Sequence, residues 1–350
     1  MTALRSFVVA ILAFIWLSSP ARAQDNCIIP RGGLVFSLPR DAIPALNYPD
    51  VVSAQDADAF LEPFDLVLGV ELNGEARAYP LSIMRWHEVV NDLLGGTLVA
   101  VNYCPLTGSG LVYSSKVGSE FVLFGVSGLL YDNNNVMFDR TSNSLWSQML
   151  VQAICGTLAG ERAQLYPIVQ STWWAWKTLY PDTTVVSLDT GFDRNYGVNP
   201  YIAYRRPDNT ELFFPQSFVD PRRPVKELVL GIEHDGLARA YPYTVLGHRG
   251  AINDVVNGLS VLVVYDENAR LAIAFERKRR DEDLTLTLDV VDGAFPFRLT
   301  DRETGTLWSL TGMAVEGPLA GARLEPIATY SSMWFAWAAF HRGTQIYTPE

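Results

Sequence analysis

The alternation of apolar and polar positions predicts a chain built mainly of short strands. Two apolar runs flank an Asn-Gly pair within residues 65–80, which is the pattern of a β-hairpin. Apolar residues at helical spacing favour a helix over 81–94, and the aromatic stretch 172–180, closed by Pro181, favours another. Further strands are predicted at 98–103, 110–115, 120–126 and 184–188.

The same pattern occurs twice along the chain. Residues 65–80 and 227–242 are identical at 11 of 16 positions, and several later pairs recur at the same offset of 162. The aromatic helix recurs at an offset of 161. An ordered series of this length predicts an internal duplication. We therefore expect an α+β protein of two tandem repeats, each a mainly antiparallel β-sheet with a few short helices.

The duplication sets the expected domain boundaries. Residues 62–188 form the first repeat and 227–350 the second, with an N-terminal extension at 24–61. The segment 189–226, rich in Pro, Arg and Tyr, has no equivalent after the second repeat. It is either a linker or a lid over the first repeat.

Residues 1–23 have the pattern of a secretory signal peptide. Arg5 precedes an apolar run at 7–17, and Ala21-Arg22-Ala23 is a cleavage signal, so cleavage is expected before Gln24. Eleven apolar residues are too few for a helix that crosses ~30 Å of hydrocarbon. We expect a periplasmic or secreted protein with no transmembrane segment after cleavage.

The charge balance limits which classes of partner the protein is expected to bind. Lys and Arg total 27 against 38 Asp and Glu, giving a net charge of −11. An acidic chain repels phosphate backbones, so nucleic acid is not expected as a partner. The expected partner is a small molecule or a component of the cell envelope.

The chain has three cysteines, Cys27, Cys104 and Cys155. An oxidising compartment permits one disulfide and leaves one free thiol. Because Cys27 lies in the N-terminal extension, its pairing with Cys155 is a hypothesis that leaves Cys104 free. Connectivity itself cannot be deduced from sequence.

Comparing the two copies separates structural residues from candidates for chemistry. Residues present in both are expected to serve the fold, and Arg77 and Asp139 could form an ion pair. Reactive residues present only in the first copy are the candidates. These are Cys104, His87, Ser127, Asn134 and Gln148, which face Asp266, Arg249, Asp289, Pro296 and Leu310.

The leading hypothesis is a thiol-centred site. Cys104 ends a predicted strand before a Gly-containing turn, whose N–H groups can stabilise a thiolate and lower its pKa. His87 would be its base, and Ser127 a further catalytic residue. Ligand-binding roles are assigned to Asn134, Asp139, Arg140 and Gln148. In the purely structural alternative, Cys104 is a small buried hydrophobic residue and His87 is a core residue whose ring nitrogens are hydrogen-bonded.

Other functions stay open. Cys104, His87 and a carboxylate such as Asp139 could hold a transition metal, although no spacing matches a metal motif and no motif indicates a cofactor. A third hypothesis is an envelope scaffold. The residues alone do not decide whether the protein is an enzyme.

Three stretches resemble the uncharacterised family DUF3179: VNYCPLTGSGLVYSS, FGVSGLLYDNNNVMFDRTSNSLWSQ and DTGFDRNYGVNPYIAY. The resemblance covers residues 62–205 and implies an exported protein, with no assigned reaction. Many members carry Cys-Pro-x-Cys where this chain has Cys104-Pro105-Leu106-Thr107, which implies that Thr107 replaces a second thiol. The motif also draws Arg194 and Asn199 toward the site, with Tyr196, Pro200 and Tyr201.

Overall fold

The computed structural model describes residues 26–349, except 31, 280–282 and 292. Strands account for 44% of the chain and helices for 9%, so the protein is mostly β. The expectation of mainly antiparallel sheets with few short helices is confirmed. The predicted signal peptide lies outside the described residues. No helix within the described ranges is long and apolar enough to cross a membrane.

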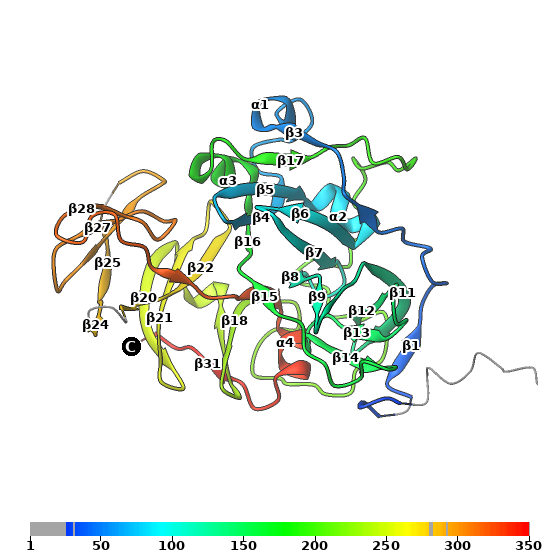
Figure 1. Ribbon diagram of the computed structural model, residues 1–350. Helices are drawn as coiled ribbons and strands as arrows, with labels where there is room; N and C mark the ends of the chain where they lie inside the picture. The colour runs from blue at the N-terminus through cyan, green and yellow to red at the C-terminus, as the bar shows by residue number, and fades with distance from the viewer. Residues whose placement is uncertain (1–25, 31, 280–282, 292, 350) are drawn as a thin grey trace, which may run out of the picture.

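Three five-stranded sheets are built from residues 34–186 (Figure 1). The first has the order β16 (Val169–Thr172), β4 (Leu66–Leu72), β5 (Glu75–Pro80), β17 (Thr184–Val186) and β3 (Val51–Ser53). The second has the order β15 (Leu165–Tyr166), β8 (Ser109–Ser114), β7 (Thr97–Cys104), β6 (Val89–Leu94) and β2 (Leu46–Asn47). The third has the order β1 (Leu34–Phe36), β11 (Phe124–Tyr131), β12 (Asn134–Asp139), β13 (Leu145–Ser147) and β14 (Gln152–Cys155). A small hairpin pairs β9 (Lys116–Val117) with β10 (Glu120–Phe121).

Residues 228–346 form three four-stranded sheets and one more small hairpin. One sheet has the order β30 (Tyr330–Met333), β18 (Leu228–His234), β19 (Leu237–Pro242) and β31 (Gln345–Ile346). Another has the order β20 (Arg249–Val256), β21 (Leu259–Asp266), β22 (Leu271–Glu276) and β29 (Glu325–Pro326). The third has the order β25 (Leu288–Val291), β26 (Arg298–Asp301), β27 (Leu307–Trp308) and β28 (Ala314–Glu316). The hairpin joins β23 (Lys278–Arg279) and β24 (Leu284–Thr285).

The helices are short. They are α1 (Ala54–Ala57), α2 (Leu81–His87), α3 (Trp173–Leu179), α4 (Trp334–Phe340) and the 3₁₀ turn η2 (Tyr243–Val245). The predicted aromatic helix is confirmed as α3. The helix predicted over 81–94 is wrong in its second half: α2 ends at His87, Glu88 has a left-handed φ of 58°, and Val89 begins β6. The β-branched pair Val89-Val90 favours a strand there, although its spacing also fitted a helix.

The two predicted hairpins are confirmed. Asn73 and Gly74 connect β4 to β5 with φ of 52° and 85°, and Asp235 and Gly236 connect β18 to β19 with φ of 46° and 80°. Positive φ at both turn residues matches the right-handed twist of the strands. The strand predicted at 120–126 is instead divided between β10 and β11.

Some residues that recur at the offset of 162 form matching structural contacts. Asp92 accepts hydrogen bonds from Arg77 (2.6 Å) and Tyr79 (2.8 Å). Asp254, 162 positions later, accepts them from Arg239 and Tyr241. The predicted pairing of Arg77 with Asp139 is therefore wrong.

Asp139 has a different structural role. Its carboxylate accepts hydrogen bonds from the Trp146 indole (3.0 Å) and from Ser142. Asp301 accepts an indole hydrogen bond in the same way from Trp308 (2.8 Å).

Residues 62–188, here the first half, and 227–349, the second half, pack through reciprocal contacts. Thr172 donates its N–H to the Ala269 carbonyl (2.9 Å), and Met333 donates its N–H to the Thr107 carbonyl (2.7 Å). Helix α4 of the second half contributes Trp334 to a core cluster made largely by the first half. Figure 1 shows α4 among the first-half strands, near β15.

A disulfide fixes the N-terminal extension. Cys27 and Cys155 are bonded across 128 positions, which confirms the hypothesised pairing. Cys104 is the free cysteine and is buried.

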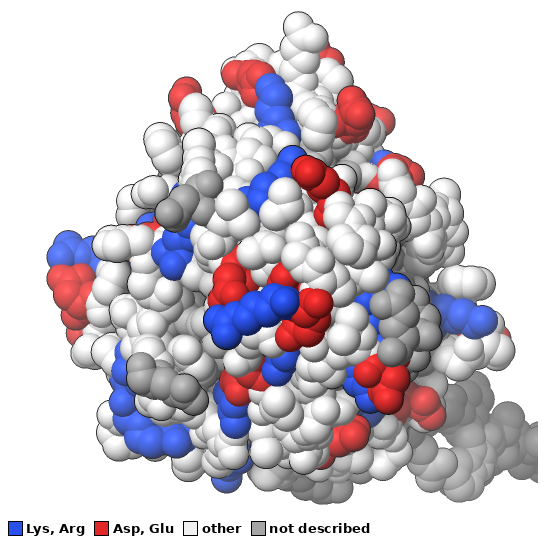
Figure 2. All heavy atoms as spheres, turned by 90° about the vertical axis from the view of Figure 1, so that its left-hand side faces the viewer, with Lys and Arg blue, Asp and Glu red and all other residues white. Residues whose placement is uncertain are grey.

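The second half presents a mixed surface. Figure 2 shows basic and acidic side chains interspersed on this face, with no broad area of one sign. Several pairs are in direct contact, among them Arg302 with Asp289 at 2.6 Å. Interspersed charges of opposite sign largely cancel at a distance, so this face creates no extended field of one sign.

The shared Asp–Arg pair gives a matched test of the fold. Asp92 is 4% exposed and Asp254 17% exposed, measured on the side chains. We expect Asp92→Asn to lower the free energy of unfolding by about 3 kcal/mol, because it weakens the main partner of a buried guanidinium. Asp254→Asn should cost less, because water screens its pair more. Urea unfolding followed by tryptophan fluorescence would contradict this if Asp254→Asn were the more costly change.

Candidate active site

Cys104 lies at the end of β7, where the chain turns toward β8. The turn is closed by a hydrogen bond from the Gly108 N–H to the Cys104 carbonyl (2.8 Å), and Gly108 has a φ of 67°. The side chain is 1% exposed, and its thiol donates to the Asn133 carbonyl at 3.8 Å. The Thr107 hydroxyl and the N–H groups of Thr107 and Asn135 face the sulfur. The expected donors are therefore present.

Glu88 is the acidic neighbour of this thiol. It follows α2, is 8% exposed, and its carbonyl accepts the N–H of Tyr103 (2.8 Å). Within the described parts of the chain, its carboxyl group forms no hydrogen bond or ion pair, and its oxygens are not among the fully buried unpartnered atoms, so the group keeps some contact with solvent. Burial raises the pKa of Glu88 to about 8.

The pKa of Cys104 is raised, which is opposite to the predicted direction. Burial, and next the charge of Glu88, raise it from 9.0 to about 11, and the facing N–H groups offset only part of this. The expected lowering of the thiol pKa is wrong. At neutral pH Cys104 is a protonated thiol beside a carboxyl group that is itself close to titration.

A buried network of polar side chains extends from the thiol. Asn134 donates to Thr107 Oγ1 (3.1 Å) and to Gln148 Oε1 (2.6 Å). Gln148 also accepts from Ser109 (2.8 Å) and donates to Asn102 Oδ1 (2.8 Å). The predicted orienters Asn134 and Gln148 are therefore brought to the neighbourhood of Cys104 through Thr107.

The second half has no counterpart of this network. The positions at an offset of 162 from Asn102, Thr107, Ser109, Asn134 and Gln148 are Val264, Ala269, Leu271, Pro296 and Leu310. Glu88 faces Gly250. Val264 and Leu271 lie in the paired strands β21 and β22, as Asn102 and Ser109 lie in β7 and β8, so this strand pairing does not require the network.

His87 is not placed at the thiol. Its Nδ1 is 2.7 Å from the Pro44 carbonyl oxygen and its Nε2 is 2.7 Å from the Tyr196 hydroxyl. The ring is fully buried beside Phe192, and burial lowers its pKa. With both nitrogens engaged elsewhere, His87 is not positioned as the base of Cys104, whereas the next residue, Glu88, is close enough to influence the thiol.

Three other predicted site residues have structural contacts. Ser127 lies at a β-bulge, where its hydroxyl donates to the Val136 carbonyl (2.5 Å) and accepts from the Leu129 N–H (3.1 Å). Arg140 forms a half-exposed ion pair with Asp41 (2.6 Å). Asp139, described above, holds Trp146. The structure does not bring these three to the thiol.

The segment 189–226, here the bridging segment, covers the site. Tyr201, Tyr204 and Phe214 pack with Cys104. Asn133 secures the cover through two hydrogen bonds of 2.9 Å to the backbone of Phe214. The cover therefore excludes water from the thiol.

The bridging segment also carries the five residues that the resemblance draws toward the site, and of these Tyr201 packs with Cys104 and Tyr196 bonds His87. Arg194 is exposed and donates to the Asp193 carbonyl at 3.3 Å. Asn199 accepts the N–H of Tyr201 (3.1 Å) and so shapes the covering turn.

Sequence reasoning missed Glu88, Asn102 and Ser109. The comparison between copies could have found all three, since they face Gly250, Val264 and Leu271. The resemblance drew Tyr201 toward the site, whereas Tyr204 carried no such signal, because the bridging segment has no counterpart in the second half.

The predicted metal ligands are not assembled. His87 and Asp139 bond to other groups, and the described residues contain no cluster of three or more His, Cys, Asp or Glu side chains. Cys104 and Glu88 alone would give a metal two protein ligands, fewer than the three of typical catalytic zinc sites.

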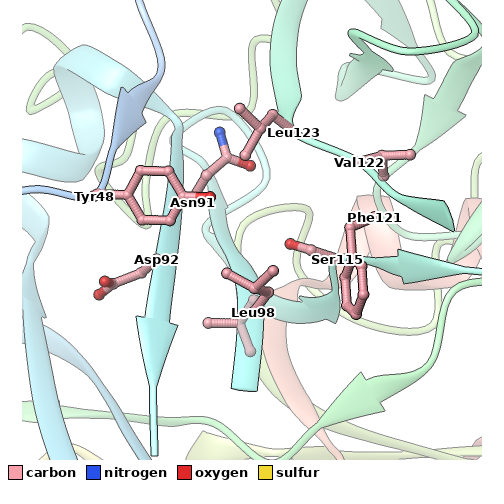
Figure 3. A pocket seen from close by; sticks show the side chains of 9 residues that line it. Tyr48, Asn91, Asp92, Leu98, Ser115, Phe121, Val122 and Leu123 are labelled. Atoms are coloured by element: carbon pink, nitrogen blue, oxygen red, sulfur yellow. The ribbon is translucent and has the colours of Figure 1, made fainter. Parts of the chain in front are cut away.

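A separate small cavity lies beside β6 and β7 (Figure 3). Its volume is about 90 Å³, and its lining includes Tyr48, Asn91, Asp92 and Phe121. Asn91 and Asp92 use their side chains to bond Phe124 and Arg77. The cavity is too small for an organic ligand and its polar groups are engaged.

Fold and site together define a mostly antiparallel β protein with a buried thiol–carboxyl pair under an aromatic cover. Residues 40–344 match the family model described as "Protein of unknown function (DUF3179)", and the chain belongs to that family. The comparison with curated proteins found no match, and neither did the comparison with solved structures.

The raised pKa of Glu88 predicts a pH-dependent stability. The folded state keeps the Glu88 proton up to a pH of about 8, whereas the unfolded chain loses it near 4.5. This contribution is fully present below pH 4.5. It is lost as the pH rises toward 8, by at most about 1.4 kcal/mol per pH unit. Urea unfolding of the wild type and of Glu88→Gln should therefore diverge over this range, with the wild type losing stability relative to the variant.

The test uses the difference in the free energy of unfolding between the wild type and Glu88→Gln, because histidines such as His341 titrate equally in both proteins. Parallel stability curves from pH 4.5 to 8 would show that Glu88 titrates normally in the folded protein.

Proposed function

We propose that the first half carries a one-thiol catalytic site in which Cys104 is the nucleophile and Glu88 transfers its proton. The observation that supports the proposal is the Glu88 carboxyl group, which forms no hydrogen bond within the described residues and lies close enough to the free thiol for its charge to raise the thiol pKa. A carboxyl group with a pKa of about 8 is suited to acid–base catalysis near neutral pH. The substrate class is a small molecule with an electrophilic carbon, such as an acyl group.

The proposed reaction is an acyl transfer. The sulfur of Cys104 bonds to the carbonyl carbon as its proton passes to the Glu88 carboxylate. The leaving group then takes that proton as its bond to carbon breaks, and water releases the acyl group from the thioester. The N–H groups of Thr107 and Asn135 stabilise negative charge that develops on sulfur.

Cysteine usage favours covalent chemistry over a dithiol cycle. Two of the three cysteines form the Cys27–Cys155 disulfide, so Cys104 has no second thiol in its own chain. Thr107 stands where the family resemblance implies another cysteine. Its hydroxyl faces the sulfur and belongs to the polar network.

We further propose that the chain arose by duplication, with 62–188 as the active copy and 227–350 as a degenerate scaffold. Matching hydrogen bonds at equivalent positions support this, as does the loss of every network residue in the second copy. The 24–61 extension and the bridging segment would then be additions, the latter serving as the lid.

The proposed location is the periplasm or the exterior. The sequence pattern of residues 1–23 supports export. A disulfide between Cys27 and Cys155 is typical of an oxidising compartment.

The catalytic proposal is tested with p-nitrophenyl acetate as the acyl donor. We expect an acetyl group on Cys104, detected by mass spectrometry, at a rate that rises with pH through about 8 as Glu88 ionises. Glu88→Gln should slow this acylation by about 10²-fold or more. Cys104→Ser should carry no acetyl group at this position.

The matched control is Glu161→Gln, which removes an exposed carboxylate outside the site and should not change the rate. Equal rates in Glu88→Gln and the wild type would overturn the role of Glu88. Failure to acylate Cys104 under conditions that preserve the fold would overturn the nucleophile.

Export is tested by secreting the full chain from a bacterial host. Amino-terminal sequencing of the mature protein should begin at Gln24, because cleavage follows Ala23. A secreted product that retains residues 1–23 would contradict the proposed processing.

A further inference from the structure

One large cleft on the molecule is separate from Cys104. It has a volume of about 740 Å³, within the range of small-molecule sites. It lies between α2, the bridging segment and the second half, which contribute Arg85, Arg205 and Tyr265 to its lining. Cys104 and Glu88 do not line it.

Four cationic side chains in this cleft have no carboxylate partner within the part of the chain that the structure describes. Arg85 forms no hydrogen bond, and its Nε is buried. Arg205 donates to the Tyr103 hydroxyl. Lys226, 3% exposed, donates to the Tyr204 carbonyl and lies 3.6 Å from the centre of that ring. Arg270 lines the exposed end.

The acidic groups in the cleft do not neutralise these cations. Glu227 is held by Arg223 at 2.5 Å, and Glu267 is paired with His248. Asp65 accepts the N–H of Glu62 (2.9 Å) and forms no ion pair within the described ranges. The cleft therefore has an excess of positive charge in a chain whose net charge is −11.

This excess is unlike the mixed surface of Figure 2, where neighbouring charges alternate in sign. Lys226 and Arg85 have no ion-pair partner within the described residues, and the charges of Glu211 and Asp65 offset only part of the cost of burying them. Burial lowers the pKa of Arg85, and the charge of Arg205 lowers it further, so the two guanidinium groups repel each other. A bound anion would relieve both costs.

The rest of the lining indicates the shape of the ligand. Phe64, Leu228, Tyr265 and Met333 supply apolar and aromatic walls next to the cations. Guanidinium groups bind phosphate through paired hydrogen bonds, and an ammonium group adds a point charge.

We propose that this cleft binds a phosphate monoester with an apolar or aromatic tail, held by Arg85, Arg205 and Lys226. The inference does not depend on the thiol chemistry of Cys104. The same headgroup chemistry occurs in free organic phosphates and in anionic lipids, and the experiment separates these sources.

The test is calorimetry of the chain from Gln24 onward with phenyl phosphate. We expect one bound molecule per chain, with at least tenfold weaker binding for benzyl alcohol, which lacks the anion, and for inorganic phosphate, which lacks the tail. Arg205→Gln and Lys226→Met should each weaken binding at least tenfold. Arg206→Gln is the matched control, since Arg206 lines the same cleft but is paired with Asp208 at 2.6 Å.

Two further measurements keep the test decisive if a variant folds poorly. Binding to the wild type should weaken as sodium chloride is raised, because the attraction is ionic. Cys104→Ser should bind within twofold of the wild type, which separates this site from the proposed active site.

Absence of phenyl phosphate binding, binding insensitive to salt, or equal losses in Arg206→Gln and Arg205→Gln would overturn the proposal. Vesicles of phosphatidylcholine with phosphatidic acid identify the source. Binding that is lost in Arg205→Gln assigns the cleft to a lipid headgroup, and no vesicle binding assigns it to a free organic phosphate.

Discussion

The reciprocal hydrogen bonds between the halves are the constraint on which the site depends. Met333 of the second half donates to the Thr107 carbonyl, and Thr107 is the residue whose hydroxyl and N–H face the Cys104 sulfur. The turn that holds the thiol is therefore fixed from both sides, by β7 and β8 and by the opposite half. A second half without reactive side chains still has a physical task, which is to hold this turn in place.

The electrostatics of the site follow from the burial of its ionisable groups. The aromatic cover of Tyr201, Tyr204 and Phe214 packs on Cys104, and burial raises the pKa of both Cys104 and Glu88. In such surroundings each acid keeps its proton to a higher pH, and ionisation of one opposes ionisation of the other. The polar network behind Thr107 is neutral and fully bonded, so it orients the site without adding charge. Chemistry there consists of moving a proton between neighbours.

Much of the fold could be predicted from the sequence, because its signals are local. The Asn-Gly and Asp-Gly turns, the aromatic helix and the strand before Cys104 depend on short-range backbone preferences. The helix predicted at 81–94 was wrong in its second half because the positions of Val89 and Val90 fit both helical and strand spacing. Cys104, Asn134 and Gln148 were found by comparing the copies. His87 was selected because it faces Arg249 at the offset of 162 and precedes the Cys104 strand, and Glu88, which faces Gly250, was overlooked. The direction of the thiol pKa required knowing that the bridging segment folds over Cys104.

The central claim is that Cys104 is a protonated thiol whose titration is coupled to Glu88. Ultraviolet titration of the thiolate in the folded wild type and in Glu88→Gln tests it most directly, with Cys104→Ser as the blank for tyrosine absorbance. The account predicts a wild-type pKa of about 11 and a lower pKa in Glu88→Gln, still above the ordinary 9.0 because burial remains. A wild-type pKa below 9.0, or the same pKa in both proteins, would contradict it.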